Sequence, residues 1–121
     1  MLVVDDDKNI FHAIEIILEP LKLKLKYCPT IKCAEKLLIA GTAAIDILLL
    51  DLAVDIRSGL DLLDSLASSN IRIPVFMISG TDAALPAATA MQKGALYYFT
   101  KPLDSKELVA RVEQVLALKP E

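Results

Sequence analysis

The chain has 121 residues, of which 55% are hydrophobic, and its formal net charge is −3. This length and composition fit one domain with a packed core, and the charge and the scattered lysines and arginines argue against a general nucleic-acid-binding surface. The longest apolar stretch is too short to span a bilayer and no signal peptide is visible, so we expect neither membrane insertion nor secretion.

The first part of the chain predicts two strands and a helix. A short strand is expected at residues 2–4, followed by a helix over about residues 8–18 that Asp7 caps and Pro20 ends. Apolar residues alternate with lysines in residues 21–27, and this period of two predicts a strand with one solvent-exposed face at a sheet edge. The apolar residues that share one face of the helix are Ile10, Ala13, Ile14, Ile17 and Leu18.

The middle of the chain continues this alternation. A helix is expected at residues 31–39, with Gly41 near its C-terminal end, and a strand is expected at residues 45–50. This strand is apolar without alternation, which indicates a central strand that is covered on both faces. A third helix over about residues 59–66 and a fourth strand at residues 74–78 follow.

The last part of the chain completes the fold. An alanine-rich helix is expected from about Asp82 to Gln92, then a strand at residues 96–100, and then a helix that Asp104 and Glu107 begin with a capping box. Five strands that alternate with five helices predict an α/β fold with a doubly wound parallel sheet. A flavodoxin-like strand order, 2-1-3-4-5, would place the first and third strands side by side.

The cysteines, Cys28 and Cys33, lie where a strand gives way to a helix. Two thiols in an acidic domain of this size are typical of a reducing cytosol and do not make a disulfide framework. Their spacing is not that of a redox pair or a zinc site. We therefore expect both to be small, buried, unpaired side chains in a cytoplasmic protein.

Acidic side chains end two of the predicted strands. Asp5 and Asp6 directly follow the first strand, and Asp51 ends the third. Because the carboxyl ends of neighbouring parallel strands meet at one edge of the sheet, these carboxylates are expected to converge. Their repulsion would raise at least one pKa, and a hard divalent cation with oxygen ligands would remove the conflict. The sequence therefore predicts a Mg²⁺ site at this edge, where Ser79 and Lys101 also follow strands.

Short motifs around these residues resemble, in their order and spacing, the receiver domain of two-component response regulators. The match covers nearly the whole chain, so residues 1–121 are expected to form one such domain. Each motif alone is weak, whereas the ordered set is specific. The motifs are Val3-Val4-Asp5-Asp6, Leu49-Leu50-Asp51 with Gly59 eight residues later, Met77-Ile78-Ser79-Gly80, and Gly94-Ala95 followed by Tyr98-Phe99-Thr100-Lys101-Pro102.

The resemblance implies a signalling function centred on Asp51. This residue would be the nucleophile that takes a phosphoryl group from a sensor histidine kinase and becomes 4-aspartylphosphate. Asp5, Asp6, Asp51 and the backbone carbonyl of Ala53 would hold Mg²⁺. The domain would be a signalling phosphoacceptor and not an enzyme, although it would catalyse its own phosphotransfer and slow autodephosphorylation. No direct binding to nucleic acid or to a membrane is expected.

The resemblance also implies how the phosphoryl group would be bound and sensed. Ser79 would donate a hydrogen bond to it, and Lys101 would pair with its charge; the peptide bond between Lys101 and Pro102 would be cis. Tyr98 would be the aromatic switch that turns inward when Ser79 moves toward the phosphate. The surface of the fourth helix, fifth strand and fifth helix would then carry the signal, through a homodimer or a downstream effector.

Three other functions compete with this one. A flavin-binding flavodoxin-like carrier needs a hydroxyl- and glycine-rich phosphate loop, whereas Asp5, Asp6 and Asp7 would repel a phosphate. An aspartyl-phosphate phosphatase needs a second aspartate two residues after the nucleophile, where this chain has Ala53. A pseudo-receiver that only scaffolds protein contacts stays open, although the complete set of acids, hydroxyl and lysine argues against it. The family usually has proline where this chain has Asp55, which adds negative charge beside the site.

Overall fold

The computed structural model describes residues 1–121 except 42–44, 55–57, 81–83 and 118–121. Five parallel strands form one sheet in the order β2-β1-β3-β4-β5, which confirms the predicted doubly wound, flavodoxin-like fold. The strands are β1 (Leu2–Val4), β2 (Lys26–Cys28), β3 (Leu48–Asp51), β4 (Val75–Ser79) and β5 (Tyr97–Thr100). The helices are α1 (Lys8–Leu18), α2 (Ile31–Ile39), α3 (Gly59–Ser68), α4 (Ala84–Gln92) and α5 (Ser105–Ala117), and a short 3₁₀ helix, η1 (Glu19–Leu21), follows α1.

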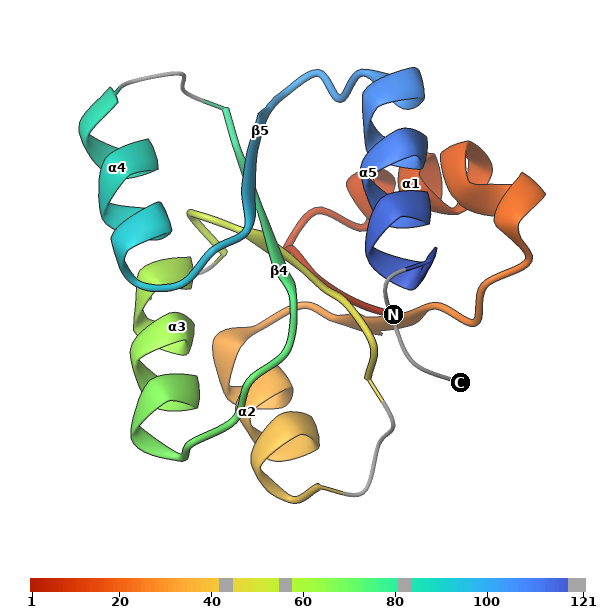
Figure 1. The fold of residues 1–121 in the computed structure, drawn as a ribbon. Coiled ribbons are helices and arrows are strands. Elements are labelled where there is room, and N and C mark those ends of the chain that lie inside the picture. Colours follow the sequence, from red (N-terminus) through yellow and green to blue (C-terminus); the bar gives the residue numbers. More distant parts are fainter. Residues whose placement is uncertain (42–44, 55–57, 81–83, 118–121) are drawn as a thin grey trace.

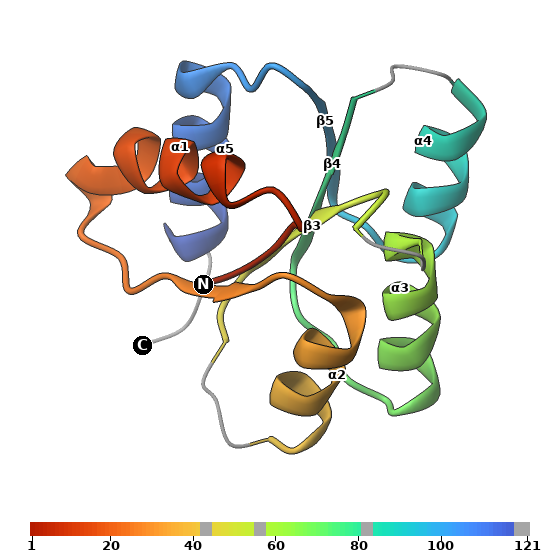
Figure 2. The same ribbon diagram turned by 180° about the vertical axis from the view of Figure 1, so that it is seen from behind.

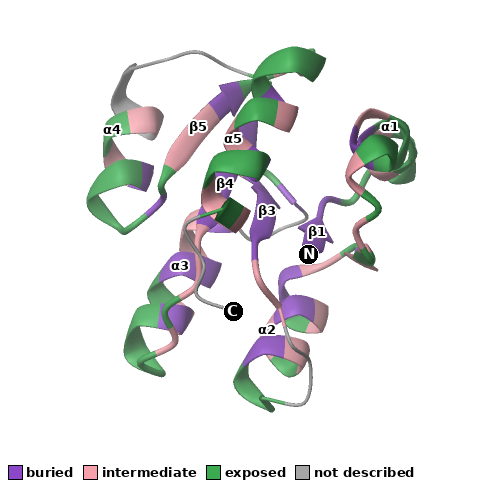
Figure 3. Ribbon diagram, turned by 45° about the vertical axis from the view of Figure 1, so that its right-hand side comes forward, coloured by how far each residue is buried: buried purple, intermediate pink, exposed green. Residues whose placement is uncertain are grey.

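Helices cover both faces of the sheet. α1 and α5 lie on one face, and α2, α3 and α4 lie on the other (Figures 1 and 2). Val3 and Leu49 belong to the apolar cluster on the α1 and α5 side, whereas Val4 and Leu50 belong to the cluster on the other side. Figure 3 shows that the central strands β1 and β3 are buried, as expected for strands that helices cover on both faces of the sheet. None of the described helices is long and apolar enough to cross a membrane.

The lysine-rich segment before β2 is not the long strand that its alternation predicted. Pairing begins only at Lys26, because β1 has three residues and its register runs from Leu2↔Lys26 to Val4↔Cys28. Leu21 instead lies in η1, and Lys22 ends that helix with a positive φ of 55°. The predicted alternation of exposed and covered side chains is nevertheless present, since the lysines are exposed and the leucines are half-buried. β2 lies at the edge of the sheet, as predicted.

Other element boundaries differ by a few residues. β3 begins at Leu48 and not at residue 45, although the carbonyl of Ile47 still accepts a hydrogen bond from the Leu2 amide at 2.9 Å. Ala13, which the helical spacing placed on the apolar face of α1, is exposed. Asp82, the predicted start of the fourth helix, and Asp55 lie outside the described residues.

The starts of α1 and α5 are capped by the predicted aspartates. Asp7 Oδ1 accepts a hydrogen bond from the Asn9 amide at 2.9 Å. Asp104 Oδ1 accepts one from the Glu107 amide at 3.1 Å, which is one of the two hydrogen bonds of the predicted capping box. The first of these caps matters for function, because it fixes the chain where it leaves β1.

The prediction of two unpaired cysteines is wrong, because Cys28 and Cys33 form a disulfide. Cys28 is the last residue of β2, and Cys33 lies in the first turn of α2. Thr30 caps this helix by accepting a hydrogen bond from the Cys33 amide at 3.1 Å. The tight turn brings the two α-carbons to 5.6 Å, a separation that a disulfide spans. Composition and compartment carry no information about such local geometry.

Candidate functional site

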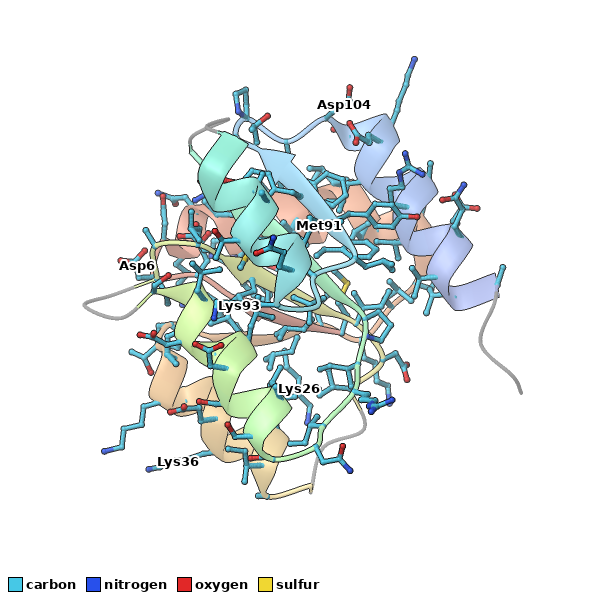
Figure 4. All side chains as sticks on the ribbon, turned by 60° about the vertical axis from the view of Figure 1, so that its left-hand side comes forward. Asp6, Lys26, Lys36, Met91, Lys93 and Asp104 are labelled. Atoms are coloured by element: carbon cyan, nitrogen blue, oxygen red, sulfur yellow. A yellow bond between two sulfur atoms is a disulfide. The ribbon has the colours of Figure 1, made fainter. Side chains whose placement is uncertain are left out.

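Three carboxylates meet at the carboxyl edge of the sheet. Asp5 follows β1 and Asp51 ends β3, and these strands are neighbours in the sheet. Oxygen atoms of Asp5, Asp6 and Asp51 all lie within 4.8 Å of one another, which confirms the predicted convergence. Asp5 and Asp51 are buried, whereas Asp6 is exposed at the periphery of the molecule (Figure 4). The cluster is therefore accessible from solvent on the Asp6 side.

The turn after β1 holds Asp5 in place. Asp5 Oδ1 accepts a hydrogen bond from the Asp7 amide at 2.8 Å, and the Asp5 amide donates to the Cys28 carbonyl at 3.2 Å. Asp7 is in turn the N-cap of α1. The acidic turn and the start of the helix thus form one hydrogen-bonded unit, in which the orientation of Asp5 is set by the backbone.

Lys101 lies between the two buried carboxylates. Its Nζ is 3.2 Å from Asp5 Oδ2 and 3.6 Å from Asp51 Oδ1. Its backbone amide donates to the Ser79 carbonyl at 2.7 Å, and its peptide bond to Pro102 is cis. Partial burial alone would lower the pKa of Lys101, but the attraction of Asp51 and Asp5 outweighs it and the pKa is raised. Lys101 therefore stays cationic at neutral pH.

The surroundings of Asp51 disfavour the ionised form of its carboxyl group. Burial raises its pKa to about 6, and the negative charge of Asp5 acts in the same direction. The positive charge of Lys101 and a hydrogen bond from the backbone amide of Ala53 partly offset this rise. Without a further cation, a substantial fraction of Asp51 would be protonated near pH 6.

We expect the metal-free protein to gain stability from Asp51 as the pH falls. The carboxyl has a pKa of about 6 in the folded state and of 3.8 in the unfolded state, so between these values the folded state holds the extra proton. The gain is complete below the unfolded pKa and is lost as the pH rises through the folded one. Between about pH 7.5 and about pH 5 it amounts to about 1 kcal/mol.

Urea denaturation in a chelating buffer measures this effect. Asp51→Asn is the control, because it removes this titration and leaves the other carboxyl groups in place. As the pH falls from about 7.5 to about 5, the free energy of unfolding of the wild type should rise relative to that of the variant. Identical pH profiles for the two proteins would show that the pKa of Asp51 is not raised.

Ser79 and Tyr98 lie on the two strands beyond β3. Ser79 ends β4, one residue after Ile78, which pairs with Asp51 in the sheet. It is 3% exposed. Tyr98 lies on β5 opposite Met77 and is half-buried against the cluster on the α2, α3 and α4 side. Ser79 thus belongs to the edge that carries the acids, whereas Tyr98 lies farther back along the next strand.

The turn after β3 is fixed by residues that the sequence analysis did not assign to the site. The Leu52 amide donates to the Ile78 carbonyl at 2.8 Å, and the Leu52 carbonyl accepts from the Gly59 amide at 2.6 Å and the Ser58 hydroxyl at 3.3 Å. Ala53 and Ser58 form an antiparallel bridge. Serine directly before the predicted helix start was the available signal, since serine is a preferred N-cap.

Tyr27 is a second residue that sequence reasoning did not place at the site. Its ring stacks on Phe11 of α1, with the ring centroids 4.8 Å apart. Burial raises the pKa of the Tyr27 hydroxyl, and the negative charges of Asp5, Asp6 and Asp7 raise it further. The phenol therefore stays protonated near the acid cluster. Its position one residue before the end of β2 was the only signal in the sequence.

The groups at this edge fit a hard cation. The clustered side chains, Asp5, Asp6 and Asp51, offer only oxygen ligands. The backbone carbonyl of Ala53 is a further oxygen two residues after Asp51. Mg²⁺ and Ca²⁺ prefer such ligands, whereas zinc sites usually include histidine or cysteine. Burial, and after it the negative charge of Asp5, raises the pKa of Asp51, and a divalent cation beside the carboxylate would counter both effects.

The chain is similar to known proteins in sequence and in fold. A family model described as "Response regulator receiver domain" matches residues 1–113. The response regulator protein TmoT of Ectopseudomonas mendocina is 32% identical over 98% of this chain and 53% of its own length. The heme response regulator HssR of Staphylococcus aureus is 34% identical over 95% of this chain and 50% of its own length. The chain thus spans about half the length of these relatives.

Solved structures agree with the sequence comparisons. The receiver domain of NtrX from Brucella abortus superposes with a TM-score of 0.84 at 28% identity and covers 98% of both chains. The receiver domain of the Francisella response regulator 1452 superposes with a TM-score of 0.84 at 29% identity and covers 96% of this chain and 94% of that one. The chain belongs to the response regulator receiver domain family, whose members act in two-component signalling.

Proposed function

We propose that residues 1–121 form a cytoplasmic receiver domain in which Asp51 accepts a phosphoryl group from a sensor histidine kinase. The observation that carries this proposal is the position of the Asp51 carboxylate, buried among two other acids and 3.6 Å from the Lys101 ammonium. A buried anion is costly without a cation beside it, and the Lys101 ammonium together with a bound Mg²⁺ would suit both an attacking carboxylate and the phosphoryl group that it receives.

In the transfer step, Asp51 acts as the nucleophile. One of its carboxylate oxygens attacks the phosphorus of a phosphohistidine while the phosphorus–nitrogen bond breaks. The electron pair of that bond returns to the donor imidazole, which takes up a proton, and Asp51 becomes an acyl phosphate. Mg²⁺ held by Asp5, Asp6, Asp51 and the Ala53 carbonyl would supply positive charge for the phosphoryl oxygens.

Two other residues would bind the phosphoryl group. Lys101 is a compact charge that already contacts Asp51 and Asp5, so it needs only a small shift to pair with a phosphoryl oxygen. Ser79, at the end of the neighbouring strand, would donate a hydrogen bond from its hydroxyl. Ser79 ends β4 and Lys101 directly follows β5, so the sheet positions both groups before transfer.

The signal would leave the site through β5. The Lys101 amide donates to the Ser79 carbonyl at 2.7 Å, so a shift of Ser79 toward the phosphoryl group would pull on the end of β5. Tyr98, half-buried on that strand, would respond by turning inward. We propose that the surface of α4, β5 and α5 then binds a second copy of the domain or a downstream effector.

Phosphorylation by a small donor tests the proposal without knowledge of the kinase. Incubation with acetyl phosphate and Mg²⁺ is expected to raise the intact mass by one phosphoryl group. A chelator should prevent the increase, and hydroxylamine, which cleaves acyl phosphates, should reverse it. If neither acetyl phosphate nor phosphoramidate labels the protein in the presence of Mg²⁺, the chain is a pseudo-receiver that only scaffolds protein contacts.

A further inference from the structure

The segment that follows Asp51 is held from two sides. On one side, the Leu52 amide donates to the Ile78 carbonyl of β4 at 2.8 Å. On the other, the Leu52 carbonyl accepts hydrogen bonds from the Gly59 amide and from the Ser58 hydroxyl at 2.6 and 3.3 Å. Leu52 is therefore tied both to the sheet and to the start of α3.

This tie controls the backbone of Ala53. Ala53 directly follows Leu52 and pairs with Ser58 in an antiparallel bridge. Its amide hydrogen-bonds to the Asp51 carboxylate, and its carbonyl is the backbone oxygen assigned to the cation in the proposed function. The Leu52 carbonyl and the Ala53 amide belong to one peptide group. A rotation of this group would disturb the hydrogen bond of the Ala53 amide and shift the Ala53 carbonyl, which belongs to the next peptide group.

The Ser58 hydroxyl has two partners at once. Its oxygen accepts a hydrogen bond from the Leu60 amide at 3.1 Å, which makes Ser58 the N-cap of α3. Its proton goes to the Leu52 carbonyl at 3.3 Å. The hydroxyl thus joins the start of a helix to the backbone between the phosphoacceptor and the carbonyl ligand. Alanine can do neither, whereas threonine can do both.

We propose that Ser58 is a positioning residue for the cation site: through Leu52 it holds the Ala53 carbonyl and the Asp51 carboxylate in the geometry that binds Mg²⁺. This role rests on the proposed function, since it concerns the same cation. It goes further, because it assigns part of the cation affinity to a side chain that touches neither the cation nor the phosphoryl group.

The test compares Mg²⁺ affinity with stability. Calorimetric titration of Ser58→Ala with Mg²⁺ is expected to give a dissociation constant about tenfold higher than that of the wild type. Ser58→Thr should restore the wild-type value, because its hydroxyl can make both hydrogen bonds. Ser58→Gly guards against a folding defect, because glycine is a tolerated N-cap, and it should bind Mg²⁺ as weakly as Ser58→Ala.

Thr30→Ala is the matched control. Thr30 caps α2 in the same manner, by accepting a hydrogen bond from the Cys33 amide, but within the described part of the chain it makes no hydrogen bond to residues 52–54. Its loss should lower the metal-free melting temperature, although less than Ser58→Ala does because Ser58 makes one hydrogen bond more, and should leave the Mg²⁺ dissociation constant unchanged. The contrast separates loss of a helix cap from loss of positioning.

Two results would overturn the role of Ser58 and leave the proposed function intact. One is a Ser58→Ala variant that binds Mg²⁺ as tightly as the wild type. The other is a Thr30→Ala variant that loses as much affinity as Ser58→Ala, which would show a general effect of stability. A wild-type chain that neither binds Mg²⁺ nor accepts a phosphoryl group would instead overturn the proposed function, and the role of Ser58 with it.

Discussion

Replacing Asp51 with asparagine is expected to abolish labelling by acetyl phosphate. The amide is a poor nucleophile and cannot form a stable acyl phosphate, so loss of the carboxylate removes the reaction itself and not only its rate enhancement. The variant should remain folded, because asparagine has nearly the same shape and carries no charge, which removes both the cost of burying the carboxylate and its repulsion by Asp5. Intact mass after incubation with donor and Mg²⁺ provides the measurement.

Asp46→Asn provides a control of the same chemical change. Asp46 precedes β3 and so lies at the amino edge of the sheet, whereas Asp51 ends that strand. The control variant should take up one phosphoryl group as the wild type does. If Asp51→Asn were labelled to the same extent as Asp46→Asn, the acceptor would be another carboxylate of the cluster, and the central assignment would be wrong.

Gly59→Ala should destabilise the fold by about 3 kcal/mol and remove phosphoacceptor activity with it. A Cβ at this position would overlap the carbonyl oxygen of Asp51 and would lie 3.2 Å from the Leu50 side chain. The carbonyl is backbone in a buried strand, so neither partner can move aside without shifting β3 or α3. Urea denaturation of the variant measures the loss of stability.

Gly80→Ala is the matched control at the same edge of the sheet. Nothing lies within 4 Å of a Cβ added to Gly80, so this variant should be as stable as the wild type or slightly more stable. Equal stabilities of the Gly59 and Gly80 variants would mean that α3 can withdraw from Asp51 freely. The close packing at Gly59 would then have no role in holding the site.

The order of strands and helices could be predicted because the chain separates its apolar runs clearly. The apolar runs that form β3 and β4 are continuous, and α1 and α5 begin at aspartate caps. These four elements could therefore be predicted from local sequence, without knowledge of tertiary contacts. The alternation of residues 21–27 failed as a predictor of strand length. Period-two exposure is also produced by an extended segment that lies over the core without a hydrogen-bonded partner, and β1 is too short to pair with more of it.

The acid cluster could be predicted because register alone brings it together. Asp5 and Asp51 follow paired residues of neighbouring parallel strands, so their convergence needs no side-chain detail. The contacts of Ser58 could not be predicted in the same way, because they depend on how the turn after β3 folds back on itself. The disulfide of Cys28 and Cys33 could not be predicted for the same reason, since the tightness of the four-residue connection between them decides whether the thiols meet.

The ion pair between Lys101 and Asp5 joins positions 96 residues apart in the chain. During synthesis, the ribosome therefore releases all three acids long before the lysine that pairs with Asp5 and Asp51. Contacts of such high sequence separation form late, because loop closure must precede them. A nascent chain that lacks β5 and Lys101 would carry the proposed nucleophile without this cation, and the proposed phosphoacceptor site would be complete only when the last strand has joined the sheet.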